Sequence, residues 1–240
     1  ITTVEEITVT AQRREESLQD TPIAITAFSK RQLETQRVEN VMDLLNQVPS
    51  VNIAPWAGSR VAPNLFIRGM GNLNTQSTND MATGIYIDGV PVGRGIGLAT
   101  DLADLERVEV LRGPQGTLRG RPSPAGAVTM TTRRPDLGEV GGSVSGSFSD
   151  ADAQNYQGAL NVPIVKDTLA LRVAGVKNTN EGPGGKLLNG DAPEVDDEGL
   201  RATLLFQATD ELEFLLTHHY MDRAIDNFTF VEGAGAGYNG

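Results

Sequence analysis

Residues 105–135 read LERVEVLRGPQGTLRGRPSPAGAVTMTTRRP, and this stretch decides how the fold of the chain is interpreted. Residues 106–112 alternate between charged and aliphatic side chains, which is the period of a β-strand. The sequence Gly-Pro-Gln-Gly at 113–116 ends that strand, because proline lacks an N–H group and glycine admits positive φ. A β-branched, threonine-rich run at 127–132 predicts a second strand, which Pro135 closes.

Residues 105–120 resemble the signature of the plug domain of TonB-dependent outer-membrane receptors. In that family the segment usually reads ERIEVLRGPQGTLYG, followed by a short turn, the sequence GGAIN and a closing strand. The chain departs from the pattern at Arg119, where the family commonly has tyrosine or phenylalanine, and at PSPAG (residues 122–126), where NATGG is more usual. The two prolines stiffen that turn, so the departures concern local turn geometry.

Three further stretches fit the same family in the expected order. EITVTA at 6–11 is similar to a TonB box, PNLFIRGMG at 63–71 resembles the central plug strand, and GIYIDGVPV at 84–92 resembles the Asp-Gly hairpin of the plug. By this resemblance the chain is identified as a member of the family. The resemblance implies an α+β plug domain followed by antiparallel strands of a transmembrane β-barrel, which in such transporters has about 22 strands.

The resemblance assigns residues 1–20 to a TonB box and a flexible linker. The β-branched residues 7–10 can pair as an added strand with a partner sheet, and in this family the partner is the energy-coupling protein TonB. On its own, a segment with so few apolar residues is expected to be disordered. The expected TonB-binding residues are Glu6, Ile7, Thr8, Val9, Thr10 and Ala11.

Residues 21–135 are expected to form the plug domain, a small mixed α+β globule. Ser29 followed by Gln32 is a capping-box pattern, which predicts a helix over 30–35. A second helix is predicted over 41–47 and ends before a proline. Its apolar stripe consists of Val41, Leu44, Leu45 and Val48.

Short strands and loops are predicted in the rest of the plug. The pair Asp88-Gly89 between apolar residues is a strong signal for a two-residue β-hairpin. Loops are expected at 56–60 and at 72–82, the second of which is polar and lacks a period. The predicted strands span 22–28, 51–54 and 65–68.

After the plug, the pattern changes to strict alternation over about five strands in residues 136–240. Strands of about 10 residues with this period are typical of a transmembrane barrel, with apolar side chains toward lipid and polar ones toward the lumen. A soluble sandwich also alternates. The connections favour the barrel, because tight turns at 165–167 and 209–211 alternate with long polar connections at 178–199 and 223–240.

Five strands do not close a barrel, since the smallest bacterial barrels have about eight strands. An open edge in hydrocarbon would leave backbone groups unpaired at several kcal/mol each. We therefore expect the chain to be the front third of a longer polypeptide. Its start lacks a charged-then-apolar leader, which predicts a mature or processed chain.

Composition narrows the class of protein further. The 240 residues carry a formal net charge of −11 and contain no cysteine. Nucleic acid is not expected as a partner, because phosphate binding needs a basic face, and disulfides and thiolate metal sites are excluded. No apolar run approaches the roughly 20 residues of a membrane-spanning helix. Averaged hydropathy would indicate a soluble protein, but it fails for barrels because their strands alternate.

No catalytic, cofactor or metal site is expected from the sequence. His218 and His219 are neighbours on a strand and point to opposite faces, which prevents both from binding one ion. The glycine-rich runs at 113–120 and 182–186 lack the context of a phosphate loop. An acidic cluster lacks the spacing of a calcium loop and is interpreted as a solvated loop face. Its members are Asp191, Glu194, Asp196, Asp197 and Glu198.

The resemblance implies two further groups of site residues. Plug arginines of the family pair with carboxylates of the barrel wall, and the matching motifs carry this role to Arg68 and Arg112. The alternative is that each arginine forms an ordinary exposed ion pair, which contributes little to stability. The nutrient is expected to meet loops at the plug apex, where Trp56 either stacks on the ligand or is buried. The apex residues are Trp56, Arg60, Asn72 and Asn74.

The function implied by the resemblance is active uptake of a scarce nutrient, such as a siderophore, across the outer membrane. The expected partners are the TonB protein, outer-membrane lipid and a small nutrient, with the plug and N-terminus facing the periplasm. Two alternatives stay open: a receptor-like subunit that scaffolds a surface complex without transport, and a secreted all-β enzyme, which would need an acid/base or nucleophile set that the sequence does not provide.

Overall fold

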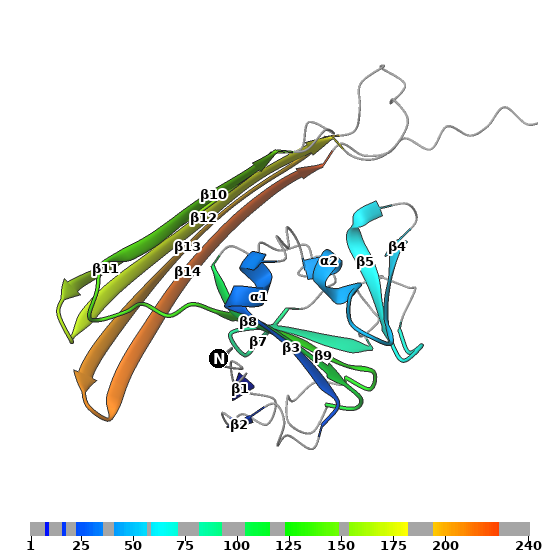
Figure 1. Cartoon of the computed structure of the whole chain (residues 1–240), viewed down its shortest axis with the longest axis horizontal. Helices are drawn as coiled ribbons and strands as arrows, with labels where there is room; N and C mark the ends of the chain where they lie inside the picture. Colours follow the sequence, from blue (N-terminus) through cyan, green and yellow to red (C-terminus); the bar gives the residue numbers. More distant parts are fainter. Residues whose placement is uncertain are drawn as a thin grey trace, which may run out of the picture. The chain divides into compact units, whose positions relative to one another are not determined.

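The chain divides into two compact units, Ile1–Arg133 and Arg134–Gly240 (Figure 1). The predicted end of the plug, at residue 135, lies within two residues of this division. The computed structural model describes residues 8–9, 16–17, 23–35, 41–56, 59–71, 82–92, 104–115, 123–148, 154–181 and 194–225.

The first unit is built on a mixed five-stranded sheet in the order β3-β8-β9-β6-β7. Its two central strands, β8 (Leu105–Arg112) and β9 (Gly126–Thr132), confirm the strands predicted at 106–112 and 127–132. They pair antiparallel, whereas β6 (Thr83–Ile87) runs parallel to β9. The outer strands are β3 (Ile25–Ser29) and β7 (Val90–Val92).

Two short helices follow β3, as the sequence predicts. Helix α1 spans Lys30–Thr35, and the backbone N–H of Ser29 donates to Oε1 of Gln32 at 2.9 Å, which is one half of the predicted capping box. Helix α2, Val41–Leu45, is two residues shorter than predicted. After Leu45 the chain continues in hydrogen-bonded turns, in which the N–H of Gln47 donates to the carbonyl of Leu44 at 3.0 Å. The four residues of the predicted apolar stripe are all buried.

The core of the first unit lies on one face of this sheet. The buried side chains of α2 pack there with the inward residues of four sheet strands and of the neighbouring hairpin. The fully or almost fully buried members include Val41, Leu44, Leu45, Ile67, Ile85, Val108, Val110, Val128 and Met130. The predicted apolar alternation of β8 therefore sets the direction of the core.

The predicted loop at 56–60 is wrong at Trp56, Ser59 and Arg60, and residues 57–58 lie outside the described residues. Strands β4 (Val51–Trp56) and β5 (Ser59–Ile67) form an antiparallel hairpin, so Trp56 and Arg60 lie in strands. The sequence conceals this because Pro55 pairs with Pro63, and proline normally lowers the expectation of a strand. The register shifts just after this pair, between Pro55 and Trp56.

The predicted Asp88-Gly89 hairpin is confirmed, and its turn is also hydrogen-bonded to the end of the central strand β9. Both residues have positive φ, +49° and +80°, as a type I′ turn requires. The carboxylate of Asp88 accepts hydrogen bonds from the backbone N–H and the hydroxyl of Thr132, each at 2.8 Å. The turn is therefore held by the end of β9.

The second unit is one antiparallel sheet of five consecutive strands, β10-β11-β12-β13-β14, which is long and curved in Figure 1. The tight turns predicted at 165–167 and 209–211 are confirmed. The strands are β10 (Gly141–Phe148), β11 (Gln154–Val165), β12 (Leu169–Glu181), β13 (Glu194–Thr209) and β14 (Leu212–Ile225).

The strands extend further than the sequence predicts. The long connection expected at 178–199 is wrong at both ends, because β12 continues to Glu181 and β13 begins at Glu194. The connection expected from 223 likewise begins later, after Ile225. These strand ends are polar, so they lack the apolar alternation from which the strands were predicted. The backbone hydrogen bonds between the strands nevertheless continue to these ends.

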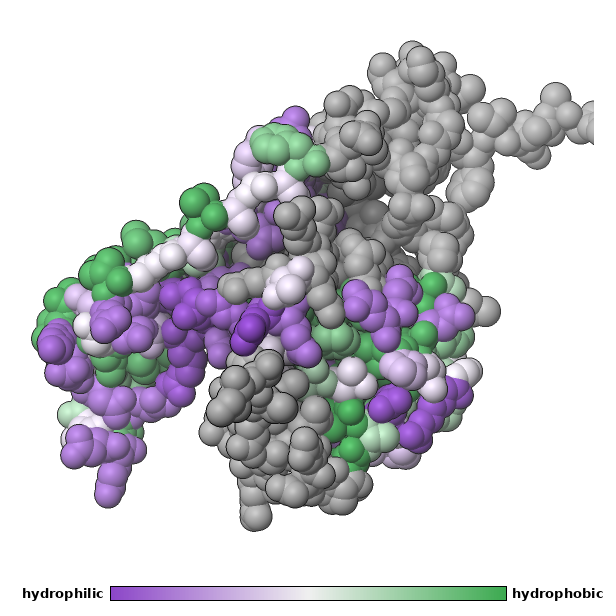
Figure 2. Space-filling model, in the orientation of Figure 1, coloured by the Kyte–Doolittle hydropathy of each residue, from purple (hydrophilic) through white to green (hydrophobic). Residues whose placement is uncertain are grey.

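The second sheet has two contrasting faces. On the apolar face, Val144 and Leu216 are 89% and 69% exposed, and Figure 2 shows hydrophobic residues gathered along this sheet. The opposite face, here called the polar face, contains buried Asn161, Arg172 and Thr203. Other large members of the apolar face are Phe148, Tyr156, Leu160, Ile164, Leu200, Phe206, Leu212, Phe214 and Tyr220.

Within the described ranges, no helix is long and apolar enough to cross a membrane.

Replacing Asp88 with alanine should loosen the end of β9, because it removes both bonds to Thr132 and places a residue without a side-chain acceptor at positive φ. A net loss of about 1–1.5 kcal/mol, a typical value for such bonds, predicts roughly tenfold faster hydrogen exchange at the Thr132 amide. Asp88→Asn is the control, since asparagine tolerates this backbone and keeps one acceptor oxygen. Equal exchange rates in both variants would contradict this role of the carboxylate.

Candidate functional site

The segment that resembles a TonB box lies partly in a short strand. β1 (Thr8–Val9) pairs antiparallel with β2 (Glu16–Ser17), with Thr8 opposite Ser17 and Val9 opposite Glu16. A strand in a two-stranded ladder has a second edge, to which another strand can be added. The remaining predicted residues of the box, Glu6, Ile7, Thr10 and Ala11, lie outside the described residues.

The predicted apex residues are only partly described. Trp56 lies at the end of β4 opposite Ser59, and Arg60 follows on β5, so the backbone brings these two positions to the closed end of one hairpin. Asn72 and Asn74 lie outside the described residues. The hairpin therefore unites two of the four predicted positions.

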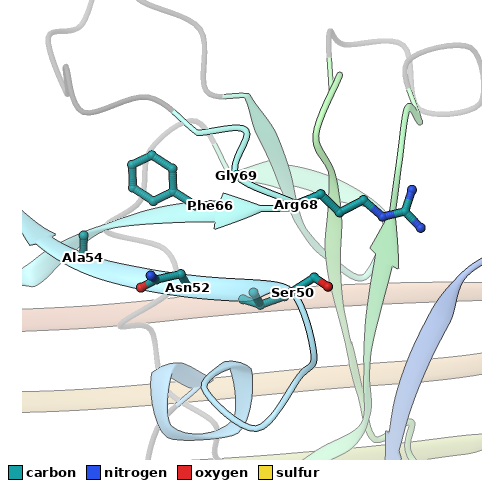
Figure 3. A pocket seen from close by; sticks show the side chains of 7 residues that line it. Ser50, Asn52, Ala54, Phe66, Arg68 and Gly69 are labelled. Carbon is teal, nitrogen blue, oxygen red and sulfur yellow. The ribbon is translucent and has the colours of Figure 1, made fainter.

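The other end of this hairpin contains a pocket of about 540 Å³ (Figure 3). Asn52 and Phe66 are directly opposite each other on β4 and β5, so both side chains lie on one face of the hairpin. In Figure 3 the side chain of Arg68 extends away from the ring of Phe66. The lining residues are Ser50, Val51, Asn52, Ala54, Phe66, Arg68 and Gly69.

Three lining residues of the pocket have left-handed backbone conformations. Arg68 (φ +53°) and Gly69 (φ +76°) form a two-residue turn, in which Ile67 and Met70 exchange backbone hydrogen bonds of 2.9 and 3.0 Å. Ser50 has φ +67°, and its carbonyl accepts a hydrogen bond from the N–H of Arg68 at 2.8 Å. Each such non-glycine residue costs of order 1 kcal/mol, and this kind of strain is typical of functional positions.

Arg112, the second predicted arginine, lies close to the same turn. Its Nη1 is 3.5 Å from the carbonyl oxygen of Pro49, and its Nε is buried without a hydrogen-bond partner. A Cβ atom on Gly113 would lie 3.7 Å from Nη1 of Arg68, so this arginine reaches the residue that follows Arg112. Among the described residues, no carboxylate forms an ion pair with either arginine. Guanidinium groups in this arrangement are suited to binding carboxylates.

A buried ion pair in β8 was not anticipated from the sequence. Nε of Arg107 lies 3.0 Å from Oε1 of Glu109, and the Glu109 side chain is fully buried. The alternation of β8 places Arg107 and Glu109 on the face opposite Val108 and Val110. In an alternating strand the polar face is usually solvated. β8 is instead a central strand that is buried on both faces, and Leu111, which lies on the same face as Glu109, was the available signal.

The described residues contain no group of histidine, aspartate or glutamate side chains able to hold a metal ion. Part of the acidic cluster that was interpreted as a loop face lies in β13, which corrects that interpretation. Asp197 forms two hydrogen bonds with the guanidinium group of Arg223, and Asp196 and Glu198 flank Lys177 at 3.4 and 3.6 Å. Cross-strand ion pairs thus account for these three carboxylates.

Comparison with known proteins agrees with the resemblance found in the sequence. Residues 17–127 match the family model of the TonB-dependent receptor plug domain. The vitamin B12 transporter BtuB of Vibrio vulnificus is 28% identical over 188 residues, which are 76% of this chain and 29% of the transporter. The catecholate siderophore receptor Fiu of Escherichia coli is 33% identical over 162 residues, 64% of this chain and 19% of the receptor.

A solved structure extends the similarity beyond the plug. The crystal structure of the ferric yersiniabactin uptake receptor FyuA from Yersinia pestis superimposes with a TM-score of 0.69 at 25% identity, over 81% of this chain and 30% of that receptor. The chain therefore spans less than a third of the length of each of these relatives.

Replacing Arg68 with asparagine should stabilise the first unit, because asparagine adopts left-handed conformations more readily than arginine. The expected gain is about 0.5–1 kcal/mol, measured as a shift of the denaturation midpoint. Arg68→Ala is the matched control: it removes the same charge but gives no relief of the backbone. If the two variants unfold at the same midpoint, the turn is not strained.

Proposed function

Because the chain belongs to the TonB-dependent outer-membrane receptors, we propose that it captures a scarce nutrient at the cell surface and imports it across the outer membrane. Residues 21–135 act as the plug of a transmembrane barrel, and residues 136–240 contribute its first strands. Residues 1–20 carry the TonB box and its linker on the periplasmic side. The nutrient is of the kind that the relatives' names describe, a siderophore or a comparable cargo.

The observation that carries this proposal is the combination of two units in one chain. A plug-family match over 17–127 is followed by five antiparallel strands with one exposed apolar face. In water such a face would be unfavourable, since monomeric soluble proteins rarely expose apolar patches larger than a few hundred Å². Against lipid the same side chains are favourable, and the polar face is left to line the lumen.

The work for import comes from the TonB protein, which pairs with the box. Thr8 and Val9 already have an extended backbone, as strand addition requires. Nutrient bound at the plug apex, near Trp56, Arg60, Asn72 and Asn74, makes the box available. Traction on the box then remodels part of the plug and opens a path.

Arg68 and Arg112 anchor the plug to carboxylates of the barrel wall. The exposed side chain of Arg68 and the buried, unbonded Nε of Arg112 support this role. A buried donor without a partner is rare in folded proteins, so a partner elsewhere in the complete receptor is expected. Pairing with a carboxylate would also offset the backbone strain at Arg68.

Val9→Pro in the full-length receptor tests the proposal. Proline removes an N–H group from the box and should abolish energised uptake in whole cells, while binding of the nutrient at the surface is unchanged. Thr3→Pro, outside the box, is the control and should leave uptake intact. Uptake that survives both Val9→Pro and deletion of residues 6–11 would refute energised transport and favour a scaffolding role.

A further inference from the structure

The chain passes from the first unit to the second through residues 134–140, here called the tether. The tether follows the end of β9 at Thr132 and leads into β10 at Gly141. Under the proposed function, the TonB protein pulls on the box, at the opposite end of the plug sequence. Traction that passes through the plug therefore reaches the barrel along the tether.

A buried side chain of β11 binds the tether through its whole amide group. Asn161 is 2% exposed, and its Nδ2 donates to the carbonyl oxygens of Asp136 and Glu139 at 3.0 and 2.7 Å. Its Oδ1 accepts a hydrogen bond from the backbone N–H of Asp136 at 2.9 Å. Both donors of the amide and its oxygen are thus engaged by the tether. Displacing the tether would remove these partners from a buried polar group, which is costly.

The tether is folded so that it presents these groups to Asn161. Oδ1 of Asp136 accepts hydrogen bonds from the backbone N–H groups of Gly138 and Glu139 at 2.7 and 3.3 Å. This is a turn closed by an aspartate side chain on the backbone that follows it. The turn brings the carbonyl groups of residues 136 and 139 to the same amide, so the tether binds Asn161 as a preformed unit.

Two further contacts join the tether to other parts of the sheet. The carbonyl of Leu137 accepts a hydrogen bond from the N–H of Asp167, in the turn between β11 and β12, at 3.0 Å. Nη2 of Arg134 lies 2.7 Å from Oε1 of Glu213 on β14. Both side chains of this ion pair are about half exposed, so it contributes little by itself. Together with Asn161, these contacts distribute a load on the tether over several strands.

The start of β10 is poorly suited to carry such a load alone. Gly141 is directly opposite Asn161, and Gly142 is opposite Leu160. Glycine weakens a strand because it has no side chain to pack and loses more entropy on ordering. A strand that is pulled at its end also opens one residue pair at a time. The contacts of the tether precede Gly141 along the chain, so they must break before β10 can be peeled from β11.

We propose that Asn161 is a positioning residue that fastens the tether to the barrel wall, so that traction on the box remodels the plug and stops before β10. This inference rests on the proposed function and adds a fixed point to it. The barrel must stay closed while the plug rearranges, since an open strand edge in hydrocarbon leaves backbone groups unpaired. The contacts of Asn161, Asp167 and Glu213 with the tether, here called the clasp, protect that closure.

Asn161→Asp in the full-length receptor tests the inference. The substitution keeps the shape of the side chain and an acceptor for the N–H of Asp136, but it replaces both donors with an oxygen that faces two carbonyl groups. Arg172 is directly opposite on β12 and offers the carboxylate of the variant a cation, so the sheet should stay folded. Thr203→Val is the matched control, because it removes the buried hydroxyl contact with Thr217 from the same row of the polar face.

Hydrogen exchange of the receptor in lipid measures the clasp without an applied force. Asn161→Asp should speed exchange of the Asp167 amide about tenfold, because its acceptor, the carbonyl of Leu137, moves with the tether. Thr203→Val should leave this rate unchanged. Asp136→Ala alters the tether and not the strands, so it should act in the same direction even if Asn161→Asp fails to fold. An unchanged rate in Asp136→Ala and in folded Asn161→Asp would overturn the inference.

Pulling the receptor from its N-terminus in a lipid bilayer measures the clasp under load. In the wild type the chain should be released up to residue 133, and the next event should need a higher force. In Asn161→Asp the release should continue at lower force by about 25 Å, the length of the tether at roughly 3.6 Å per residue. The preceding plug events should keep their forces, which a general loss of stability would not allow. Identical traces for wild type and Asn161→Asp would contradict the clasp.

The two proposals fail in different ways. If Asn161→Asp releases the tether no more readily than the wild type does, while uptake is lost in Val9→Pro, the clasp is refuted and energised transport stands. If the tether is released early in Asn161→Asp but uptake is indifferent to the box, the clasp stands and energised transport is refuted.

Discussion

The antiparallel pairing of β8 with β9 is the interaction on which the rest of the first unit depends. Both strands are central, so their backbone groups are paired on two sides and both of their faces are covered. Val108 and Val110 direct the main core to one face, and the Arg107–Glu109 pair occupies the other. The ladder also positions Arg112, which closes β8, and Thr132, which ends β9 and holds the Asp88 turn.

The second unit is organised by a different constraint. Its strands alternate, and the register aligns apolar residues of neighbouring strands on the same face, as for Leu171, Leu204 and Leu216. That face is exposed, so this sheet does not bury its apolar side chains against its own chain as a soluble sandwich would. Its polar face is held by contacts between strands, such as the Thr203–Thr217 hydroxyl pair at 3.3 Å.

Local signals were sufficient for much of the fold. The capping box marked the start of α1, and Asp88-Gly89 specified a hairpin that needs two residues with positive φ. The same logic could have found the Arg68-Gly69 turn, but arginine is unusual at its first position and conceals the pattern. The strand ends at Trp56 and Ser59 were not predicted, because Pro55 and Pro63 reduce the strand propensity of this segment.

Features that depend on tertiary context were not accessible in this way. Whether a polar residue of a strand is solvated or buried depends on the other strands and layers around it, which is why Glu109 went unnoticed. The polar ends of β12 and β13 extend the sheet by backbone pairing and salt bridges, which apolar periodicity does not record.

The most direct test of the whole account is the environment of the apolar face in the full-length receptor reconstituted in lipid. Single cysteines that carry spin labels are introduced one at a time at Val144, Ser145, Leu216 and Thr217, where the chain has no cysteine of its own. The account predicts that labels at Val144 and Leu216 collide with oxygen dissolved in the lipid, whereas labels at Ser145 and Thr217 do not. Equal accessibility of all four labels to a water-soluble nickel complex would contradict a membrane-embedded sheet.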